Sequence, residues 1–259
     1  NNMETIDISL IGLTAAFLLI IPALILDHYF DLNIKKDTIV SIGRMSLQLF
    51  LVGFFLERIF ELNYWWLNLL WLDLMIITAV LSTINRIKIN LKPIIGLISL
   101  SFLIPTLAVL IYFNAFIIRL DFLFEARYLI ALGGMLLGNV LSTNIVALNS
   151  FYQNIKIQEK FYLYRLAMGA TQWEALSPFF KRSIKLAISP ALAKTATIGI
   201  VSLPGMMSGQ IVSGSSPNTA IKYQISIMIA IYIASILSVT LTLILSSKKS
   251  FNKCGMLKN

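Results

Sequence analysis

The chain has 259 residues, of which 58% are hydrophobic and only 13% charged, and its formal net charge is +9. Soluble domains are typically about 45–50% apolar and about 25% charged, so this composition indicates a protein whose main solvent is lipid. One cysteine and one histidine exclude an internal disulfide, a Cys/His zinc site and conventional histidine catalysis.

Seven stretches of the chain are apolar over about 20 residues, the length that a helix needs to cross a hydrocarbon core about 30 Å thick. They cover residues 8–26, 38–56, 65–81, 93–113, 128–148, 184–207 and 220–245. No basic segment precedes the first stretch, which we therefore expect to be a retained span and not a cleaved signal peptide. Because lipid leaves backbone groups no water to bind, each stretch should be helical. The sequence predicts an all-α polytopic membrane protein with a single transmembrane domain over residues 1–259.

The basic residues predict the orientation of these spans. The loops after the first, third and fifth stretches and the C-terminal tail carry most of the 21 Lys and Arg residues, namely Lys35, Lys36, Arg86, Lys88, Lys92, Lys156, Lys160, Arg165, Lys181, Arg182, Lys185, Lys248, Lys249, Lys253 and Lys258. The other side carries Arg58, Arg119, Arg127 and Lys222. Because cytoplasmic loops are enriched in Lys and Arg, we expect the N-terminus outside and the C-terminus in the cytoplasm. The same distribution explains the net charge without a nucleic-acid partner.

The inside segment at about residues 149–183 is longer than the other inside loops and has a helical pattern. Phe161, Tyr164, Leu166 and Met168 alternate with basic residues at helical spacing. Gly169 then permits a left-handed turn, Thr171 can cap a following helix, and Glu174 can complete a capping box. The pattern predicts a helix, a glycine turn and a second helix, lying parallel to the membrane on its cytoplasmic side. From spacing alone, this unit either docks into a groove of another protein or rests on anionic lipid headgroups.

Polar and soft residues interrupt several apolar stretches, where an ionisable group is costly and is a functional candidate. Arg44 and Gln48 are four residues apart and share one helix face. A polar stripe with Ser142 and Thr143 marks the fifth stretch, and Thr197 accompanies a lysine in the sixth. The candidate substrate-pathway residues are Arg44, Gln48, Met135, Asn139, Lys194, Thr195, Met206 and Met207. Pro204 and Gly205 should break the sixth helix and free carbonyls that can line a cavity.

Each of these candidates has a structural alternative. Arg44 can extend its guanidinium to the cytoplasmic interface. The glycines of Gly134-x-x-x-Gly138 can form a helix-packing face, and Asn139 can hydrogen-bond between helices. The methionines can serve as adaptable packing.

Lys194 has its own alternative, an ion pair with Asp73 at a similar depth on the third stretch. Apart from this carboxylate, the spans offer few ligands of the kinds that iron sites need, so metal ligands cannot be assigned. A chelate, an anionic conjugate or a molecule like a nucleotide sugar suits Arg44 and Lys194 better than a bare metal ion.

Five sequence blocks together resemble one family. They are Ile42-Gly-Arg44-x-x-x-Gln48-Leu; Gly134-Met-x-x-Gly138-Asn139; Leu166-Ala-Met-Gly-Ala-Thr171; Ala193-Lys194-Thr195-x-x-x-Gly199-x-Val-Ser-Leu-Pro204-Gly-Met-Met-Ser-Gly209; and Ala220-Ile-Lys222-Tyr-Gln-Ile225. Through them the chain resembles the iron-export permease family of ABC transporters (FetB type), whose plant relatives are linked to aluminium tolerance. The third block also resembles the coupling loop of ABC permeases.

The resemblance implies the permease subunit of an ABC exporter in the cell membrane (plasma or inner), with two permeases paired with two cytosolic P-loop ATPases. Its cargo would be iron, an iron chelate or a small anionic solute, moved out of the cytoplasm by alternating access. ATP and Mg would bind the partner ATPase, so no cofactor and no enzymatic activity are expected of this chain. The ATPase-coupling residues would be Arg165, Leu166, Met168, Gly169, Ala170, Thr171, Trp173 and Glu174.

Other functions fit the sequence less well. A nucleotide-sugar-type ABC export permease is an alternative with the same architecture. A seven-helix retinal protein could use Lys194 as its Schiff-base lysine, but the spans lack the expected carboxylates. Neither an intramembrane-enzyme motif nor the P-loop motif of a self-sufficient ATPase occurs in the chain.

Overall fold

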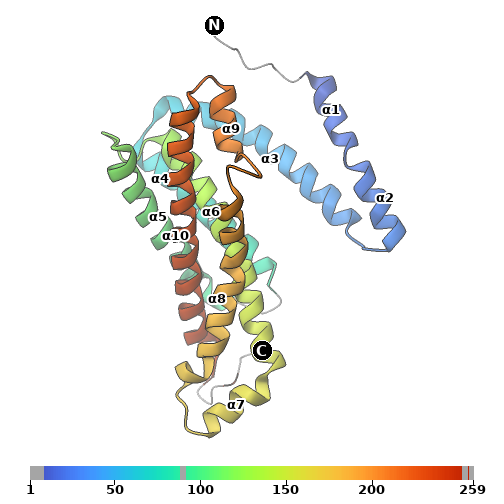
Figure 1. Ribbon diagram of the computed structural model, residues 1–259, viewed down its shortest axis with the longest axis vertical. Helices are drawn as coiled ribbons and strands as arrows, with labels where there is room; N and C mark the ends of the chain where they lie inside the picture. The colour runs from blue at the N-terminus through green and yellow to red at the C-terminus, as the bar shows by residue number, and fades with distance from the viewer. Residues whose placement is uncertain (1–8, 88–91, 253–255, 257–259) are drawn as a thin grey trace.

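The computed structural model describes residues 9–87, 92–252 and 256, and this part of the chain is helical without a β-strand (Figure 1). Its elements are α1 (Leu10–Leu18), α2 (Ile21–Phe30), α3 (Lys35–Leu62), α4 (Trp65–Asn85), a 3-10 turn (Lys92–Ile94), α5 (Ile95–Tyr112), a π-helical segment (Phe113–Ile118), α6 (Ala126–Ile157), α7 (Glu159–Ala167), α8 (Gln172–Thr197), α9 (Gly205–Val212) and α10 (Pro217–Ser250). The predicted all-α fold is confirmed.

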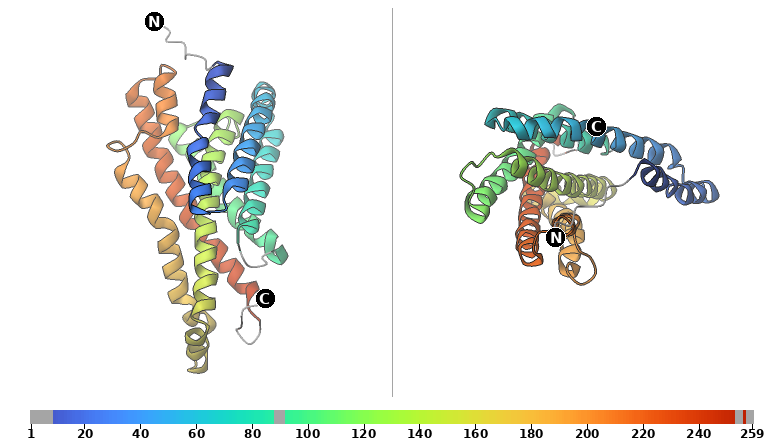
Figure 2. Two further views of the ribbon diagram at one scale, coloured as in Figure 1. Left: turned by 90° about the vertical axis from the view of Figure 1, so that its right-hand side faces the viewer. Right: turned by 90° about the horizontal axis from the view of Figure 1, so that it is seen from above.

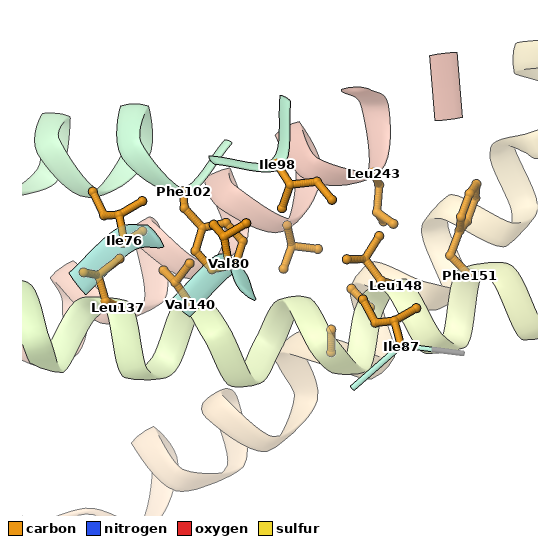
Figure 3. Close-up of a cluster of buried hydrophobic side chains, with 14 of the residues drawn as sticks. Ile76, Val80, Ile87, Ile98, Phe102, Leu137, Val140, Leu148, Phe151 and Leu243 are labelled. Atoms are coloured by element: carbon orange, nitrogen blue, oxygen red, sulfur yellow. The ribbon is translucent and has the colours of Figure 1, made fainter. Parts of the chain in front are cut away.

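The core lies between α4, α5, α6, α10 and the first half of α8, with α6 at its centre. Figure 3 shows how side chains from different helices meet there, for example Val80 of α4, Phe102 of α5 and Val140 of α6. These three side chains are completely or almost completely buried. The buried face of α10 is made largely of alanine, serine and threonine, which lets the backbones of neighbouring helices approach closely.

Side-chain hydrogen bonds also join the core helices. Asn144 of α6 donates its amide to the hydroxyl of Ser238 of α10 at 3.0 Å. Two hydroxyl pairs add to this, Ser101 with Thr242 at 2.6 Å and Tyr152 with Ser250 at 2.7 Å. Each bond ties α10 to α5 or α6, so these hydrogen bonds hold the C-terminal part of α10, from Ser238 to Ser250.

The first three helices contribute little to this core. Figure 1 shows α1, α2 and the beginning of α3 standing away from the other helices.

The turn between α2 and α3 is fixed by Asp27. Its carboxylate is buried and accepts hydrogen bonds from the backbone N–H groups of Ile34, at 2.7 Å, and Lys35, at 3.1 Å. It therefore caps the beginning of α3 and fixes the turn between α2 and α3. The apolar side chains on the outside of these helices suit contact with lipid.

Six helical stretches of the described chain are long and apolar enough to cross a membrane: 10–30 (α1 with α2), α3, α4, 95–118 (α5 with the π-helical segment), α6 and α10. The stretch at 184–207, expected to be one spanning helix, differs. There α8 begins early, at Gln172, and ends at Thr197, and α9 begins only at Gly205. With α8 and α9 taken as one interrupted crossing, the chain passes seven times between two ends, and α1 begins at the end opposite to where α10 finishes (Figure 1).

Candidate functional site

An open pocket of about 710 Å³, lined by both polar and apolar side chains, lies between α3, α4 and α6. Arg44 and Gln48 of α3 line it, as the i, i+4 spacing predicts, together with Asn85 and Arg86 at the end of α4. Ligand pockets typically measure about 300–1,000 Å³, so this pocket has the size for a small molecule. The structure thus brings together Arg44 and Gln48 of the predicted pathway and adds Arg86, which sequence analysis assigned only to a loop.

The pocket exists because α3 diverges from α4 and α6. The two sides meet at a joint near Asn63, whose side-chain oxygen accepts hydrogen bonds from the amide of Asn68, at 3.1 Å, and from the backbone N–H of Ala126, at 2.9 Å. From this joint α3 runs away from α4 (Figures 1 and 2), so that both Arg44 and Gln48 remain exposed. Because these two side chains are not covered by neighbouring helices, they are accessible to a ligand in the pocket.

Two glycines of α6, Gly134 and Gly138, form part of the pocket wall. A Cβ added at Gly138 would meet nothing within 4 Å, whereas one at Gly134 would lie 3.2 Å from Cε of Met75. Gly138 therefore widens the pocket and is not a helix contact of this chain. The close approach of α4 to α6 occurs at Gly133, where a Cβ would lie 2.9 Å from Cδ1 of Leu72.

Met135 and Asn139 lie outside the lining of this pocket. The amide of Asn139 donates to the backbone carbonyl of Met135 at 2.8 Å, within the same helix, and the side chain of Met135 packs against the core. The interhelical hydrogen bond that was the structural alternative for Asn139 is made instead by Asn144, five residues further along the chain. The sequence signal for this role of Asn144 was the presence of a second asparagine in the same apolar span.

Lys194 and Thr195 lie on the exposed side of α8, and the hydroxyl of Thr195 donates to the carbonyl of Ala191 at 2.8 Å. Asp73 is exposed as well. Within the described ranges the one ion pair joins Arg58 to Glu61, so Lys194 and Asp73 are not paired in this chain. An exposed lysine also differs from the enclosed site that a retinal Schiff base requires.

The chain leaves helical geometry between α8 and α9. Pro204 precedes the first residue of α9, Gly205, and Gly199 has a φ of +93° with its N–H donating to the carbonyl of Ser202 at 3.0 Å. Met207 is buried and Met206 packs against the core, so both methionines contribute packing in the single chain.

Residues 158–175 form a turn at one end of the bundle that we call the elbow. Gly169 has a φ of +90°, and Thr171 and Glu174 form the predicted capping box. The Glu174 carboxylate accepts hydrogen bonds from the hydroxyl and the backbone N–H of Thr171, both at 2.7 Å. These bonds lower the pKa of Glu174, so the charged form that the capping box needs persists at neutral pH.

The elbow is anchored on one side and exposed on the other. The buried ring of Tyr162 lies between Phe179 of α8, at 6.5 Å, and Phe251, at 5.8 Å. Leu166 also packs against the core, while Arg165 and Ala170 are half-buried. Met168 and Trp173 are 70% and 56% exposed. The expected second helix of the elbow is not separate, because α8 continues through Pro178 and Pro190 to Thr197.

No group of three or more His, Cys, Asp or Glu side chains that could hold a metal ion occurs among the residues that the structure describes. The single cysteine, Cys254, and three of the basic residues expected on the cytoplasmic side, Lys88, Lys253 and Lys258, lie outside those residues.

Comparison with known proteins identifies the family. The model of the uncharacterised protein family UPF0014 matches residues 10–251. The chain is 31% identical to Protein ALUMINUM SENSITIVE 3 of Arabidopsis thaliana, over 93% of this chain and 89% of that protein. It is 30% identical to the probable iron export permease protein FetB of Escherichia coli, over 96% of this chain and 95% of that protein. A third relative, the UPF0014 membrane protein YjkA of Bacillus subtilis, is 27% identical over 96% of this chain and 97% of its own length. No solved structure gives a significant match. The chain is therefore a multi-pass membrane protein that belongs to the UPF0014 family.

Proposed function

We propose that this chain is the permease subunit of an ABC exporter that moves iron, an iron chelate or a small anionic solute out of the cytoplasm. A separate P-loop ATPase would bind ATP and Mg and drive the movement. The Escherichia coli relative is named a probable iron export permease, which supports the transport class. Other relatives are named as membrane proteins, in keeping with a transporter subunit rather than an enzyme.

The main support for the proposal is the distance by which the elbow projects from the helix bundle. Helix α6 has 32 residues, which at 1.5 Å per residue is roughly 48 Å, well beyond a hydrocarbon core of about 30 Å. Helix α6 begins near the joint at Asn63, at the opposite end of the bundle. Its last turns, α7 and the start of α8 therefore extend beyond the hydrocarbon core of the membrane. Figures 1 and 2 show α7 protruding past the ends of the neighbouring helices.

This reach favours a protein partner for the elbow over lipid headgroups. An interfacial helix needs its apolar face at the boundary between headgroups and acyl chains. The elbow instead holds the exposed side chains of Met168 and Trp173 at the tip of a projection that Tyr162 fixes to the bundle. A rigid projection with apolar side chains at its tip suits insertion into a groove on a cytosolic ATPase. The basic residues around it, such as Lys160 and Lys181, agree with a cytoplasmic location.

The transport pathway would form between two copies of the chain. Lys194 and Thr195 lie in the last turns of α8, where residues 192–197 are all exposed, next to the break before α9. An ammonium group in a span is costly in contact with lipid, so a second permease would bring this part of α8 into a water-filled path. The homodimer and its ATPase pair would then make a complete exporter.

The first test is co-purification. The tagged full-length chain should bring down a P-loop ATPase from membranes of its own organism, and the isolated chain should hydrolyse no ATP. Met168→Glu at the elbow should lose the ATPase, because a carboxylate replaces an apolar contact. Val212→Glu, at an exposed site at the other end of the bundle, should keep it. Equal recovery of the ATPase with both variants would reject the elbow as its docking site. ATP hydrolysis by the isolated chain would reject the proposal that a separate subunit hydrolyses ATP.

A further inference from the structure

We infer that the pocket between α3, α4 and α6 is a binding site for an oxyanion, a small molecule or headgroup with carboxylate or phosphate groups, held by Arg44 and Arg86. That the bound molecule is cargo rests on the proposed function, whereas the binding itself does not. This site adds Arg86 to the predicted pathway and leaves Lys194 outside it.

The charge of the pocket is the first ground. Arg44 and Arg86 come from different helices and line the same space, and its lining contains no aspartate or glutamate. In the described part of the chain the only ion pair lies elsewhere, between Arg58 and Glu61. The lining therefore carries two positive charges and no negative one, and an anion bound in the pocket would be attracted to both guanidinium groups. The planar fork of a guanidinium also matches carboxylate and phosphate oxygens in bidentate geometry.

The remaining lining suits an anion with several oxygens. Gln48, Ser82 and Asn85 add amide and hydroxyl donors to the two guanidiniums. The free space at Gly138 leaves the wall of α6 open beside them. The two guanidinium groups can only donate hydrogen bonds, and the amides and hydroxyl can also donate, so the lining as a whole favours an anion rich in hydrogen-bond acceptors.

A bare cation fits this pocket poorly. The thioethers of Met45 and Met75 also line it and could contact a soft metal. Both guanidiniums would oppose the charge of such an ion, however, and no acidic side chain would neutralise it. If iron passes this pocket, we expect it inside a chelate whose outer oxygens carry negative charge.

The same oxyanion chemistry has two sources, a soluble anion from the cytoplasm or the headgroup of an anionic phospholipid entering beside α3. The test is thermal unfolding of the purified full-length chain in an uncharged detergent, with citrate, inorganic pyrophosphate, ferrous ion alone, phosphatidylglycerol or phosphatidylcholine as separate probes. No ATPase is present, so the result is independent of the elbow and its partner.

Two kinds of variant remove the site by different routes. Arg44→Gln with Arg86→Gln removes the charges, and because the side chains are exposed the core stays intact. Gly138→Leu adds an apolar side chain to the pocket wall, at a position where an added Cβ would meet no atom within 4 Å. Gly96→Leu is the matched control, since this helical glycine is also exposed, also has no atom within 4 Å of an added Cβ, and lies on α5 away from the pocket.

We expect citrate or pyrophosphate to raise the Tm of the native chain and of Gly96→Leu, and to bind at least about tenfold more weakly to both pocket variants. The arginine variant loses the charge-assisted bonds, and Gly138→Leu loses the space that the anion needs. A rise with phosphatidylglycerol alone, absent with phosphatidylcholine and lost in the same variants, would support the site with a lipid headgroup as its occupant. Stabilisation by ferrous ion alone that both pocket variants abolish would overturn the inference. So would an anion effect that is unchanged in both pocket variants, or no effect of any anion.

Discussion

Replacing Gly169 with valine is expected to impair transport-coupled ATP hydrolysis strongly while the chain still inserts into the membrane. The φ of +90° at Gly169 lies in a region that a β-branched residue strongly disfavours. A Cβ at this position would meet no other atom within 4 Å, so the effect comes from backbone strain of about 1–3 kcal/mol and not from crowding. The turn between α7 and α8 should open, which displaces Met168 and Trp173 from their docking geometry.

Hydrolysis by the reconstituted complex measures this effect, and we expect a fall of about tenfold or more, corresponding to at least about 1.4 kcal/mol. Gly169→Asn is the matched control, because asparagine tolerates positive φ better than other residues with side chains. It should retain most of the coupled activity. Undiminished coupling in Gly169→Val would favour an elbow that rests on lipid headgroups.

Replacing Lys194 with methionine is expected to impair transport strongly without lowering the stability of the chain. Lys194 is exposed and lies apart from Asp73, so its removal strands no buried carboxylate. Methionine keeps the approximate length of the side chain and removes the charge from the face that would line the path. Substrate-stimulated hydrolysis should fall by about tenfold or more, as when an interaction essential to turnover is lost, while the Tm stays unchanged or rises.

The ion-pair alternative makes the opposite prediction. If Lys194 and Asp73 formed a buried pair, the single change would cost about 3–5 kcal/mol. The double change Lys194→Met with Asp73→Leu would then restore both stability and transport. Thermal unfolding and transport of the two single variants and the double variant distinguish the two cases, and rescue by the double variant would contradict the pathway role.

Local sequence signals predicted much of the fold. Hydropathy located the apolar crossings, because twenty apolar residues in lipid have few alternatives to a helix. The glycine turn and the Thr171–Glu174 capping box were also predictable, since both depend on residues within one short segment. The continuity of α8 through Pro178 and Pro190 was not, because proline tends to end a helix, and the packing of the first half of α8 against α6 is a tertiary feature that local sequence does not reveal.

The lateral arrangement of the helices could not be predicted from hydropathy. The helical spacing put Arg44 and Gln48 on one face, yet their meeting with Arg86 depends on the divergence of α3 from the joint at Asn63. Lys194 and Asp73 have similar depths in sequence but lie on helices that do not bring them together. Gly133 is the close helix contact instead of Gly138 because the rotation of α6 is set by its neighbours.

The most direct measurement is transport in proteoliposomes that contain the chain with the P-loop ATPase that co-purifies with it. With the ATPase on the outer face, external ATP and Mg should drive uptake of labelled ferric citrate. Uptake should cease when either protein is omitted or when the P-loop lysine of the ATPase is replaced. Concentrative uptake by the chain alone, or uptake unaffected by inactivating the ATPase, would contradict a permease driven by a separate ATPase.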